Sequence, residues 1–489
     1  MATFLGLDIG TSSVKAVLVD ERQASLAEHS VPLEVARPHP LWSEQDPGDW
    51  WDATLAAVAA LRRAAPAQWA GLAGIGLSGQ QHGATLLDAR GEPLRPCILW
   101  NDGRAQGECA ELARRVPDLA ARTSNIAMPG FTAPKLLWVA RHEPEIFAKT
   151  AMILLPKDFV RHRLTGACVS DMSDAAGTLW LDVKARRWDA TLLAACGLSA
   201  AQMPGLVEGS ACSAMLSPEL AAQWGLAGRA IPVAGGGGDN ACSAIGIGAV
   251  NHGDGFLSLG TSGVIFAATD RPVAMPERTM HAFCHALPGR WHAMTVMLSA
   301  GAALDWIAGV LGQGDRVAAL LARVEEAFAS DRARDGWPVF LPYLTGERTP
   351  HNDPLATAGF GGLAISHGPE AITHAVLEGV AFALADCLDV LAAADAAPRA
   401  CMLVGGGSRS PFWAQLIADA TGLTLDLPEG AAKGAAFGAA RLAMMAAGAS
   451  ADEVCAKPKV ERSFVPDLGE RTRLQARRKR AQALHARQT

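Results

Sequence analysis

The sequence contains one short pattern twice, about half a chain apart, and this internal repeat limits the folds that the chain can adopt. Residues 7–20 are LDIGTSSVKAVLVD and residues 257–270 are LSLGTSGVIFAATD, with Leu, Gly, Thr, Ser, Val and Asp recurring in the same register. Each segment predicts a strand, a tight Gly-Thr-Ser turn and a second strand, which together form a β-hairpin. Two such copies predict two related domains with a ligand site between them.

The two copies differ at positions where a charged ligand would matter. Asp8 of the first copy corresponds to Ser258, and Lys15 corresponds to Ile265. A purely structural hairpin needs neither charge. We therefore expect the first hairpin to bind a charged ligand and the second to contribute mainly its backbone.

The segments outside the hairpins alternate between predicted strands and helices, which indicates an α/β protein. Asp46 and Pro47 are typical of a helix start, as N-cap and first helical residue. The glycine-rich stretch 245–255 marks the expected boundary between a first domain, 1–248, and a second domain, 249–489. The predicted strands are 71–80, 229–240 and 400–410, and the predicted helices are 46–65, 369–394 and 411–422.

Composition argues against several classes of protein. The net charge of −6 leaves no electrostatic footprint for nucleic acid, and no apolar run approaches the ~20 residues that a membrane span needs. The ten cysteines include no CxxC pair, and the N-terminus lacks a signal-peptide pattern, so we expect a cytoplasmic protein without nucleic-acid or membrane partners. The basic segment near the C-terminus predicts the exposed face of a terminal helix.

Glycine-rich turns can bind phosphate, because backbone amides that lack a nearby Cβ can converge on its oxygens. The sequence has no GxxxxGK[ST] motif, so its glycine turns form no P-loop. Asp8, just before the first turn, would repel phosphates unless a cation intervened, so we expect it to bind Mg²⁺ directly or through water. A turn-capping aspartate is the alternative. The three turns are Gly10-Thr11-Ser12, Gly260-Thr261-Ser262 and Gly405-Gly406-Gly407.

Asp239 follows four consecutive glycines at the end of a predicted strand. The glycines would let a substrate approach closely, and Asp239 could then accept a hydroxyl proton as a general base. The alternative is an N-cap for a helix that begins near Ala241. The local sequence favours neither, but the motif ends the first domain, which favours catalysis.

Two polar clusters could hold a polyol. Gln81 and His82 lie in the segment SGQQHG, and Trp100 and Asp102 lie in WNDGR. Amide, imidazole and carboxylate groups can bind sugar hydroxyls, and an indole ring can stack on a sugar. A buried histidine in the first cluster and a plain turn in the second explain these segments equally well.

Together these segments resemble the FGGY family of carbohydrate kinases. One family signature is matched at Gly130, Thr132, Lys135 and Trp138, whereas a second, after Gly362-Leu363, is followed only loosely. The resemblance extends to about residue 445. Matching stretches include LGLDIGTSSVKAVLVD, GLSGQQHGATLLD, LLPKDFVRHRLTG, SDMSDAAGTLWLD, AGGGGDN, FLPYLTGERTPHND and LVGGGSRSPFWAQLIADATG.

The resemblance implies two domains of the ribonuclease-H/actin type with a catalytic cleft between them. Within the family, the chain is most similar to members that phosphorylate D-xylulose, which implies transfer of a phosphoryl group from Mg-ATP to this ketose to give D-xylulose 5-phosphate and ADP. Gln81 stands where some of these members have Met. Glycerol-specific members carry an arginine and an acid at positions 81 and 82. A homodimer is a further family-level expectation.

Combined with the residue patterns above, the resemblance implies roles for individual residues. It makes Asp239 the catalytic base and Asp8 the metal ligand. The expected sugar-binding residues are Gln81, His82, Trp100, Asp102 and Asn240. The expected ATP-binding residues are Gly10, Thr11, Ser12, Lys15, Gly260, Thr261, Gly405, Gly406 and Gly407.

Two other functions remain open. One is the same chemistry on another pentulose or polyol, such as D-ribulose or an arabinitol. The other is a nonenzymatic or chaperone-like ATPase on the actin/Hsp70 scaffold, since fold alone does not determine function. The second predicts an added peptide-binding or polymerising segment, which the sequence does not contain, and it leaves Gln81, His82 and Asn240 without a task.

Overall fold

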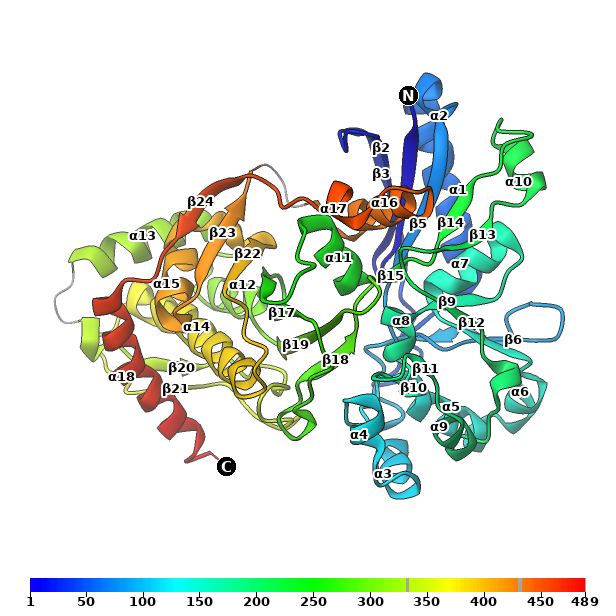
Figure 1. Cartoon of the computed structure of the whole chain (residues 1–489). Coiled ribbons are helices and arrows are strands. Elements are labelled where there is room, and N and C mark those ends of the chain that lie inside the picture. Colours follow the sequence, from blue (N-terminus) through cyan, green and yellow to red (C-terminus); the bar gives the residue numbers. More distant parts are fainter. Residues whose placement is uncertain (331–333, 430–432, 489) are drawn as a thin grey trace.

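The computed structural model describes residues 1–330, 334–429 and 433–488. Two seven-stranded sheets lie side by side, one from each half of the sequence (Figure 1). The first sheet contains β13 (Cys212–Met215), β14 (Pro232–Ala234), β5 (Leu72–Gly79), β1 (Thr3–Ile9), β2 (Ser13–Asp20) and β3 (Ser25–Pro32) in this order, with β15 (Gly237–Gly238) paired to β5. The second contains β18 (His281–Cys284), β19 (Trp291–Met297), β17 (Gly263–Thr269), β16 (Asp254–Leu259), β22 (Ala400–Val404), β23 (Thr424–Pro428) and β24 (Val460–Phe464) in this order.

Both predicted hairpins are present, and they occupy equivalent places in the two sheets. β1 and β2 pair in antiparallel fashion, and β1 pairs in parallel with β5. β16 pairs in the same two ways with β17 and β22. The prediction of two related α/β domains is therefore confirmed.

The two hairpins differ in register by one residue. Ile9 lies opposite Val14 in the first hairpin, whereas Leu259 lies opposite Gly263 in the second. The second turn is therefore one residue shorter. As a result Asp8 faces Lys15 across the first hairpin, but Ser258 faces Val264 across the second.

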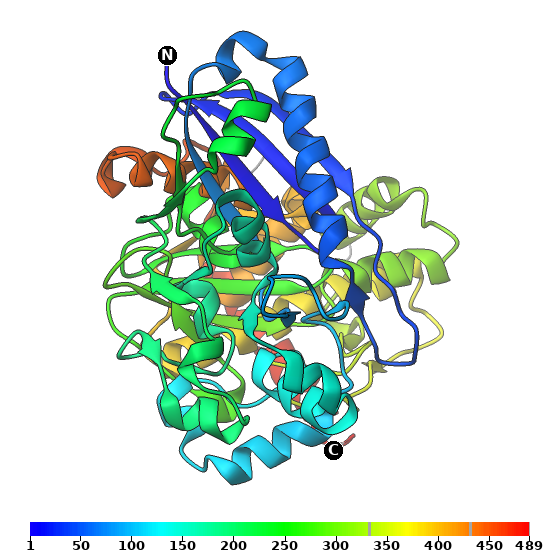
Figure 2. The ribbon, with the colours of Figure 1, turned by 90° about the vertical axis from the view of Figure 1, so that its right-hand side faces the viewer.

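Helices cover the sheets. α1 begins at Pro47, where the side chain of Asp46 accepts a hydrogen bond of 2.8 Å from the amide of Gly48, and it runs across β2 and β3 (Figure 2). The longer helices are α1 (Pro47–Ala64), α3 (Gln106–Arg115), α5 (Thr132–His142), α7 (Pro156–Thr165), α11 (Asp239–Ile247), α12 (Gly301–Val310), α13 (Val317–Ser330), α14 (Pro369–Ala393), α15 (Pro411–Thr421), α16 (Ala435–Ala446) and α18 (Leu468–His485).

Shorter elements complete the chain. The short helices are α2 (Pro66–Trp69), α4 (Leu119–Thr123), α6 (Pro144–Lys149), α8 (Met172–Ala176), α9 (Ala190–Ala195), α10 (Pro218–Gln223) and α17 (Ala451–Val454). The remaining strand pairs are β4 (Glu44–Gln45) with β7 (Cys97–Ile98), β6 (Thr85–Leu87) with β8 (Met152–Leu154), β9 (Val169–Asp171) with β12 (Gly205–Val207), β10 (Leu181–Asp182) with β11 (Arg187–Trp188), and β20 (Val339–Leu341) with β21 (Gly359–Gly361).

α16 comes from the second half of the sequence but packs on the sheet of the first half, as the orange helix beside β5 in Figure 1 shows. The contact is between backbones. A Cβ atom added to Gly6 or Gly76 would lie 1.9 or 1.8 Å from the carbonyl oxygen of Ala436 or Ala439. The domain division after residue 248 stays a prediction, and α16 crosses it in space.

α11 contacts both halves. Its residues Ala241 and Ile245 belong to the apolar cluster that includes α16, whereas Ala244 and Ile247 pack with Phe256 of the second sheet. Because α11 begins at Asp239, the candidate base lies at the start of a helix that both sheets share.

α18 is the predicted terminal helix and keeps an exposed face that includes Gln475, Lys479 and Arg480, but its opposite side is buried against the protein. Leu474, Arg477 and Ala481 are buried, and the guanidinium of Arg477 pairs with Glu378 of α14 at 2.6 Å. The positive charges on one side of α18 therefore attach it to the body of the protein. Among the described residues no helix combines the length and apolar character that a membrane crossing requires.

Candidate active site

The predicted catalytic and metal-binding residues meet at one edge of the first sheet. β1, β5 and β15 are parallel neighbours, with Asp8 beside Ser78 and Ser78 beside Gly237. The carboxyl ends of parallel strands are where α/β proteins commonly bind ligands. Asp8 lies near the end of β1, and Asp239 follows β15 directly.

Asp239 is held by the residue that follows it. The backbone amide and the side-chain amide of Asn240 donate to Oδ1 of Asp239 at 2.7 and 3.0 Å, and the side chain remains partly exposed. The N-cap of α11 is Gly238, so Asp239 does not act as the N-cap. Burial, and then the negative charge of Asp8, raise the pKa of Asp239 to about 6, which suits a general base near neutral pH.

Asp8 has one oxygen engaged by the protein. The Ser78 hydroxyl donates to Oδ1 of Asp8 at 2.8 Å. Burial raises the pKa of Asp8, while the Ser78 hydrogen bond and the charge of Lys15 oppose this rise. Lys15 itself is half-exposed and lies 3.3 Å from Glu28. A carboxylate oxygen beside a phosphate-binding turn is a suitable donor for a hard divalent cation.

The first glycine of each hairpin turn shapes the turn. Gly10 donates its amide to Ser13 at 3.0 Å, and Gly260 donates to Ser262 at 3.1 Å. The amides of Thr11 and Thr261 make no hydrogen bond with any described residue. The threonine amides, rather than those of the glycines, are thus available for a phosphate.

The third glycine turn lies directly against the second hairpin. Gly405 has a φ of +93°, and a Cβ atom there would lie 2.7 Å from the carbonyl oxygen of Leu259. A Cβ atom on Gly407 would lie 2.5 Å from the Leu259 side chain. Since Leu259 precedes Gly260, the structure brings both predicted ATP-binding segments of the second sheet together.

His82 is fixed in an unusual backbone conformation by the residues of the family signature. Its φ is +68°, and its carbonyl accepts hydrogen bonds from Thr132 and Lys135 at 3.1 and 2.9 Å. Its Nδ1 lies 2.6 Å from the carbonyl of Gly177, so Nδ1 carries the proton and Nε2 is an acceptor. Burial lowers the pKa of His82 to about 3, so the ring is neutral at physiological pH.

Gln81 and Trp100 connect the sugar-binding candidates to the rest of the site. A Cβ atom on Gly238 would lie 2.7 Å from Cδ of Gln81, which places the Gln81 side chain against the residue before Asp239. Trp100 is 41% exposed, and its indole N–H donates to the Thr11 hydroxyl at 2.9 Å. These two predicted residues therefore adjoin the base and the first phosphate-binding turn.

Asp102 is in a different situation. Its side chain is fully buried and pairs with Arg104 at 2.7 Å, and the amide of Ser43 donates to it at 2.6 Å. No part of the carboxylate is accessible to a sugar. The geometry therefore favours a structural role for Asp102, as an anchor of its loop, over the predicted sugar contact.

Two residues that are absent from the predicted site lie in it. These are Ser78, which binds Asp8, and Gln80, whose side-chain oxygen accepts from the Thr11 hydroxyl at 2.9 Å. Both lie in the last three residues of the predicted strand 71–80. Their position at a strand end was the available signal.

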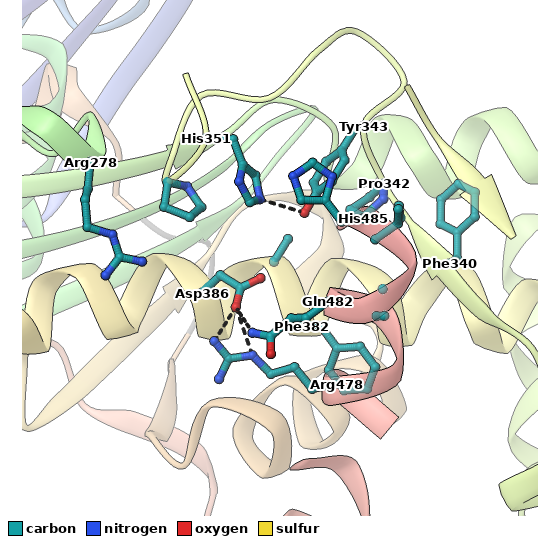
Figure 3. Close-up of a pocket in the computed structure, with 15 residues that line it drawn as sticks. Arg278, Phe340, Pro342, Tyr343, His351, Phe382, Asp386, Arg478, Gln482 and His485 are labelled. Carbon is teal, nitrogen blue, oxygen red and sulfur yellow. Dashed lines mark hydrogen bonds and ion pairs between the residues drawn. The ribbon is translucent and has the colours of Figure 1, made fainter. Parts of the chain in front are cut away.

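A cavity of about 170 Å³ lies elsewhere, between α14, α18 and residues 340–351 (Figure 3). None of the predicted site residues lines it. Its polar groups bind each other: Gln482 donates to Asp386 at 2.9 Å, and Tyr343 lies 3.0 Å from His351. The cavity therefore belongs to the attachment of α18.

Comparison with known proteins identifies close relatives. The model of the FGGY family of carbohydrate kinases, N-terminal domain, matches residues 3–246, and that of the C-terminal domain matches residues 255–447. A xylulose kinase from Escherichia coli K12 is 50% identical over 99% of this chain and 98% of its own length, and one from Klebsiella pneumoniae is 51% identical over 92% and 91%. The crystal structure of a "xyloylose kinase" from Brucella ovis superposes with a TM-score of 0.95 at 50% identity, covering 99% of this chain and 98% of the other.

Proposed function

The chain belongs to the FGGY family of carbohydrate kinases, and on this basis we propose that it transfers the γ-phosphoryl group of ATP to the C5 hydroxyl of D-xylulose, giving D-xylulose 5-phosphate and ADP. The observation that carries the proposal is the placement of Asp239, which is partly exposed at the carboxyl edge of the sheet and has a pKa of about 6. Curated relatives that are half identical over nearly the whole chain are xylulose kinases.

In this mechanism Asp239 takes the proton of the substrate hydroxyl as the oxygen attacks the γ-phosphorus. Asn240 holds Oδ1, so Oδ2 is the oxygen that receives the proton. The hydroxyl then needs only to lie within hydrogen-bond reach of Oδ2. Phosphoryl transfer requires little covalent chemistry from the protein, which contributes mainly by positioning the hydroxyl and the γ-phosphate.

Gln81, His82 and Asn240 are the proposed contacts to the ketose, with Trp100 at the side of the first turn. The neutral His82 ring accepts a sugar hydroxyl at Nε2. Gln81 contributes an amide next to Gly238. Asp102 is left out of this set, because Arg104 and Ser43 bind its carboxylate.

ATP is proposed to bind between the hairpin turns. Its phosphates would contact the amides of Thr11, Ser12 and Thr261 and the side chain of Lys15. Its nucleoside would lie against Gly405–Gly407. The residues fit a divalent cation, since Oδ2 of Asp8 has no hydrogen bond with any described residue. We propose Mg²⁺ held by Asp8, where it would neutralise phosphate charge.

A panel of acceptors tests the proposal. Purified protein with Mg-ATP is expected to release ADP fastest with D-xylulose, and more slowly with D-ribulose, D-arabinitol or gluconate. Equal or faster turnover of one of the other acceptors would change the substrate. ADP release that no acceptor stimulates would favour the actin/Hsp70-like ATPase instead. Sedimentation would test the predicted homodimer in the same preparation.

A further inference from the structure

Five charged side chains form a closed cluster beneath the glycine run that leads to Asp239. Lys157, Asp158 and Arg161 lie on α7, and Asp171 and Asp174 lie at the start of α8. All five side chains are completely buried. The Lys157 ammonium lies 2.6, 2.9 and 3.0 Å from the carboxylates of Asp158, Asp171 and Asp174.

Stability alone does not explain this cluster. Removing charges from water is unfavourable, and apolar side chains of similar volume commonly stabilise a fold at least as well. The cluster also has three carboxyl groups for two cations, and burial raises the pKa of Asp174 well above its usual range. The contacts that the cluster makes with its surroundings therefore indicate its role.

Arg161 holds the start of the glycine run. Its Nη1 donates to the carbonyl of Ala234 at 2.5 Å, and its Nη2 donates to the carbonyl of Gly235. The same guanidinium lies 3.4 Å from Asp158. The cluster thus orients a two-pronged donor toward the backbone at the start of the run.

Ser173 holds the end of the run. Its hydroxyl donates to Asp171 at 2.5 Å and accepts the amide of Gly238 at 3.2 Å. Its carbonyl accepts from the side chain of Gln81 at 3.5 Å. Ser173 therefore connects the buried cluster to the residue before Asp239 and to a proposed sugar contact.

A run of four glycines needs such support. Glycine has more conformational freedom than any other residue, and Gly236 has a φ of +78°. A general base, however, works only when it is held close to one geometry. We propose that Arg161 and Ser173 are positioning residues for Asp239, anchored by the buried Lys157–Asp cluster. The expected loss of kcat rests on the proposed function, whereas the expected loosening of the glycine run does not.

Ser173→Ala is the sharpest test, because Asp171 still caps α8 through the Ser173 and Asp174 amides. We expect kcat with D-xylulose to fall roughly 10- to 100-fold while KM for ATP stays unchanged. Ser173→Thr, which keeps the hydroxyl, should restore part of the rate. Arg161→Lys keeps the charge but removes the two-pronged contact, and should also lower kcat.

Ser170→Ala is the matched control. Ser170 is a buried serine three residues away whose hydroxyl has no hydrogen-bond partner in the described structure. This variant should keep the wild-type rate. In an Asp239→Asn background, Ser173→Ala should have no further effect, because nothing is left to position.

A second measurement does not depend on activity. Hydrogen exchange of the peptide covering residues 234–240 should be faster in Ser173→Ala and Arg161→Lys, and unchanged in Ser170→Ala. Unchanged exchange in both variants, or equal rate losses with and without Asp239, would overturn the inference. If the wild type phosphorylates no acceptor, the proposed function fails, and the exchange measurement still decides the positioning role.

Discussion

The Ser78 hydroxyl donates a 2.8 Å hydrogen bond to Oδ1 of Asp8 from the neighbouring parallel strand. This bond opposes the rise that burial causes in the pKa of Asp8, so it favours the ionised form that binds a cation. Ser78→Ala should therefore raise the Mg²⁺ concentration for half-maximal rate by about tenfold, as measured by initial rates over a magnesium series. An unchanged half-maximal concentration would contradict this role of the Ser78 hydrogen bond in the metal site.

Replacement of Asp239 should abolish turnover without unfolding the protein. We expect Asp239→Asn to lower kcat by roughly 10²- to 10⁴-fold, the range of general-base contributions. In the wild type, the base must be deprotonated, so kcat/KM should rise with pH through about 6 and then level off. A flat profile between pH 5 and 7.5, in buffers that keep the fold intact, would contradict this role.

The same substitution should stabilise the fold. The pKa of Asp239 is raised from 3.8 to about 6, so above pH 6 the folded state carries an unfavourable buried charge. Asp239→Asn should raise the free energy of unfolding by about 1–2 kcal/mol at pH 8, after allowance for partial exposure. This gain should shrink as pH falls below 6 and vanish below about pH 3.8, where both states are protonated. Denaturant unfolding at several pH values measures it.

Lys135 is expected to destabilise the fold through its buried charge and to support the sugar site through its hydrogen bond to His82. Burial lowers its pKa from 10.5 to about 7, and its ammonium donates to the carbonyl of His82. Lys135→Met should raise KM for the ketose by about 2–10-fold, since one of two donors to that carbonyl is lost. It should leave KM for ATP unchanged.

The stability of the Lys135→Met variant relative to the wild type should depend on pH. In the wild type, the buried charge of Lys135 lowers the free energy of unfolding by its full amount below pH 7. This cost disappears as pH rises toward 10.5, where Lys135 of the unfolded chain also loses its proton. The variant's advantage in unfolding free energy should therefore decrease between pH 7 and 9.5. A constant difference over this range would show that Lys135 keeps its charge in the folded protein and that burial does not lower its pKa.

Gly438 lets α16 touch the backbone of α11. A Cβ atom at Gly438 would lie 1.8 Å from the carbonyl oxygen of Cys242, so Gly438→Ala should lower the free energy of unfolding by about 1–3 kcal/mol. Gly434→Ala, at the N-cap of the same helix, meets nothing within 4 Å and should lower stability by only about 0.5 kcal/mol, because Ala is a poorer N-cap than Gly. Thermal melts of both variants compare them directly. Equal melting temperatures would contradict the close contact.

The sequence predicts the repeated hairpins and the main helices, because both depend on local patterns. It does not predict that Ser258 faces Val264 rather than Ile265, since the turn residues are alike and only the pairing reveals the shorter turn. The buried cluster of Lys157 with three aspartates also escaped prediction. Charged residues in a sequence normally indicate surface, and only the packing of α7 on the sheet buries these.

A site residue could be proposed from the sequence where its type is tied to a chemical task, as for Asp239, and its role stays a prediction. Asp102 is the contrary case. An aspartate in a turn looks available to a ligand, but Arg104, two residues later, folds back to pair with it. The buried side of the basic C-terminal helix was not predicted for a related reason, because Glu378, the partner of Arg477, is about 100 residues away along the chain.

The crossing of α16 has a consequence for synthesis on the ribosome. The strands that carry Gly6 and Gly76 leave the exit tunnel long before residues 435–446 are made. At usual elongation rates, roughly 20–70 s separate the two events. While its second half is translated, the nascent chain therefore carries a first sheet that lacks its packing partner α16. This half can complete its packing only shortly before the chain leaves the ribosome. Truncated products should accordingly be recognised by chaperones and proteases, not persist as a folded half.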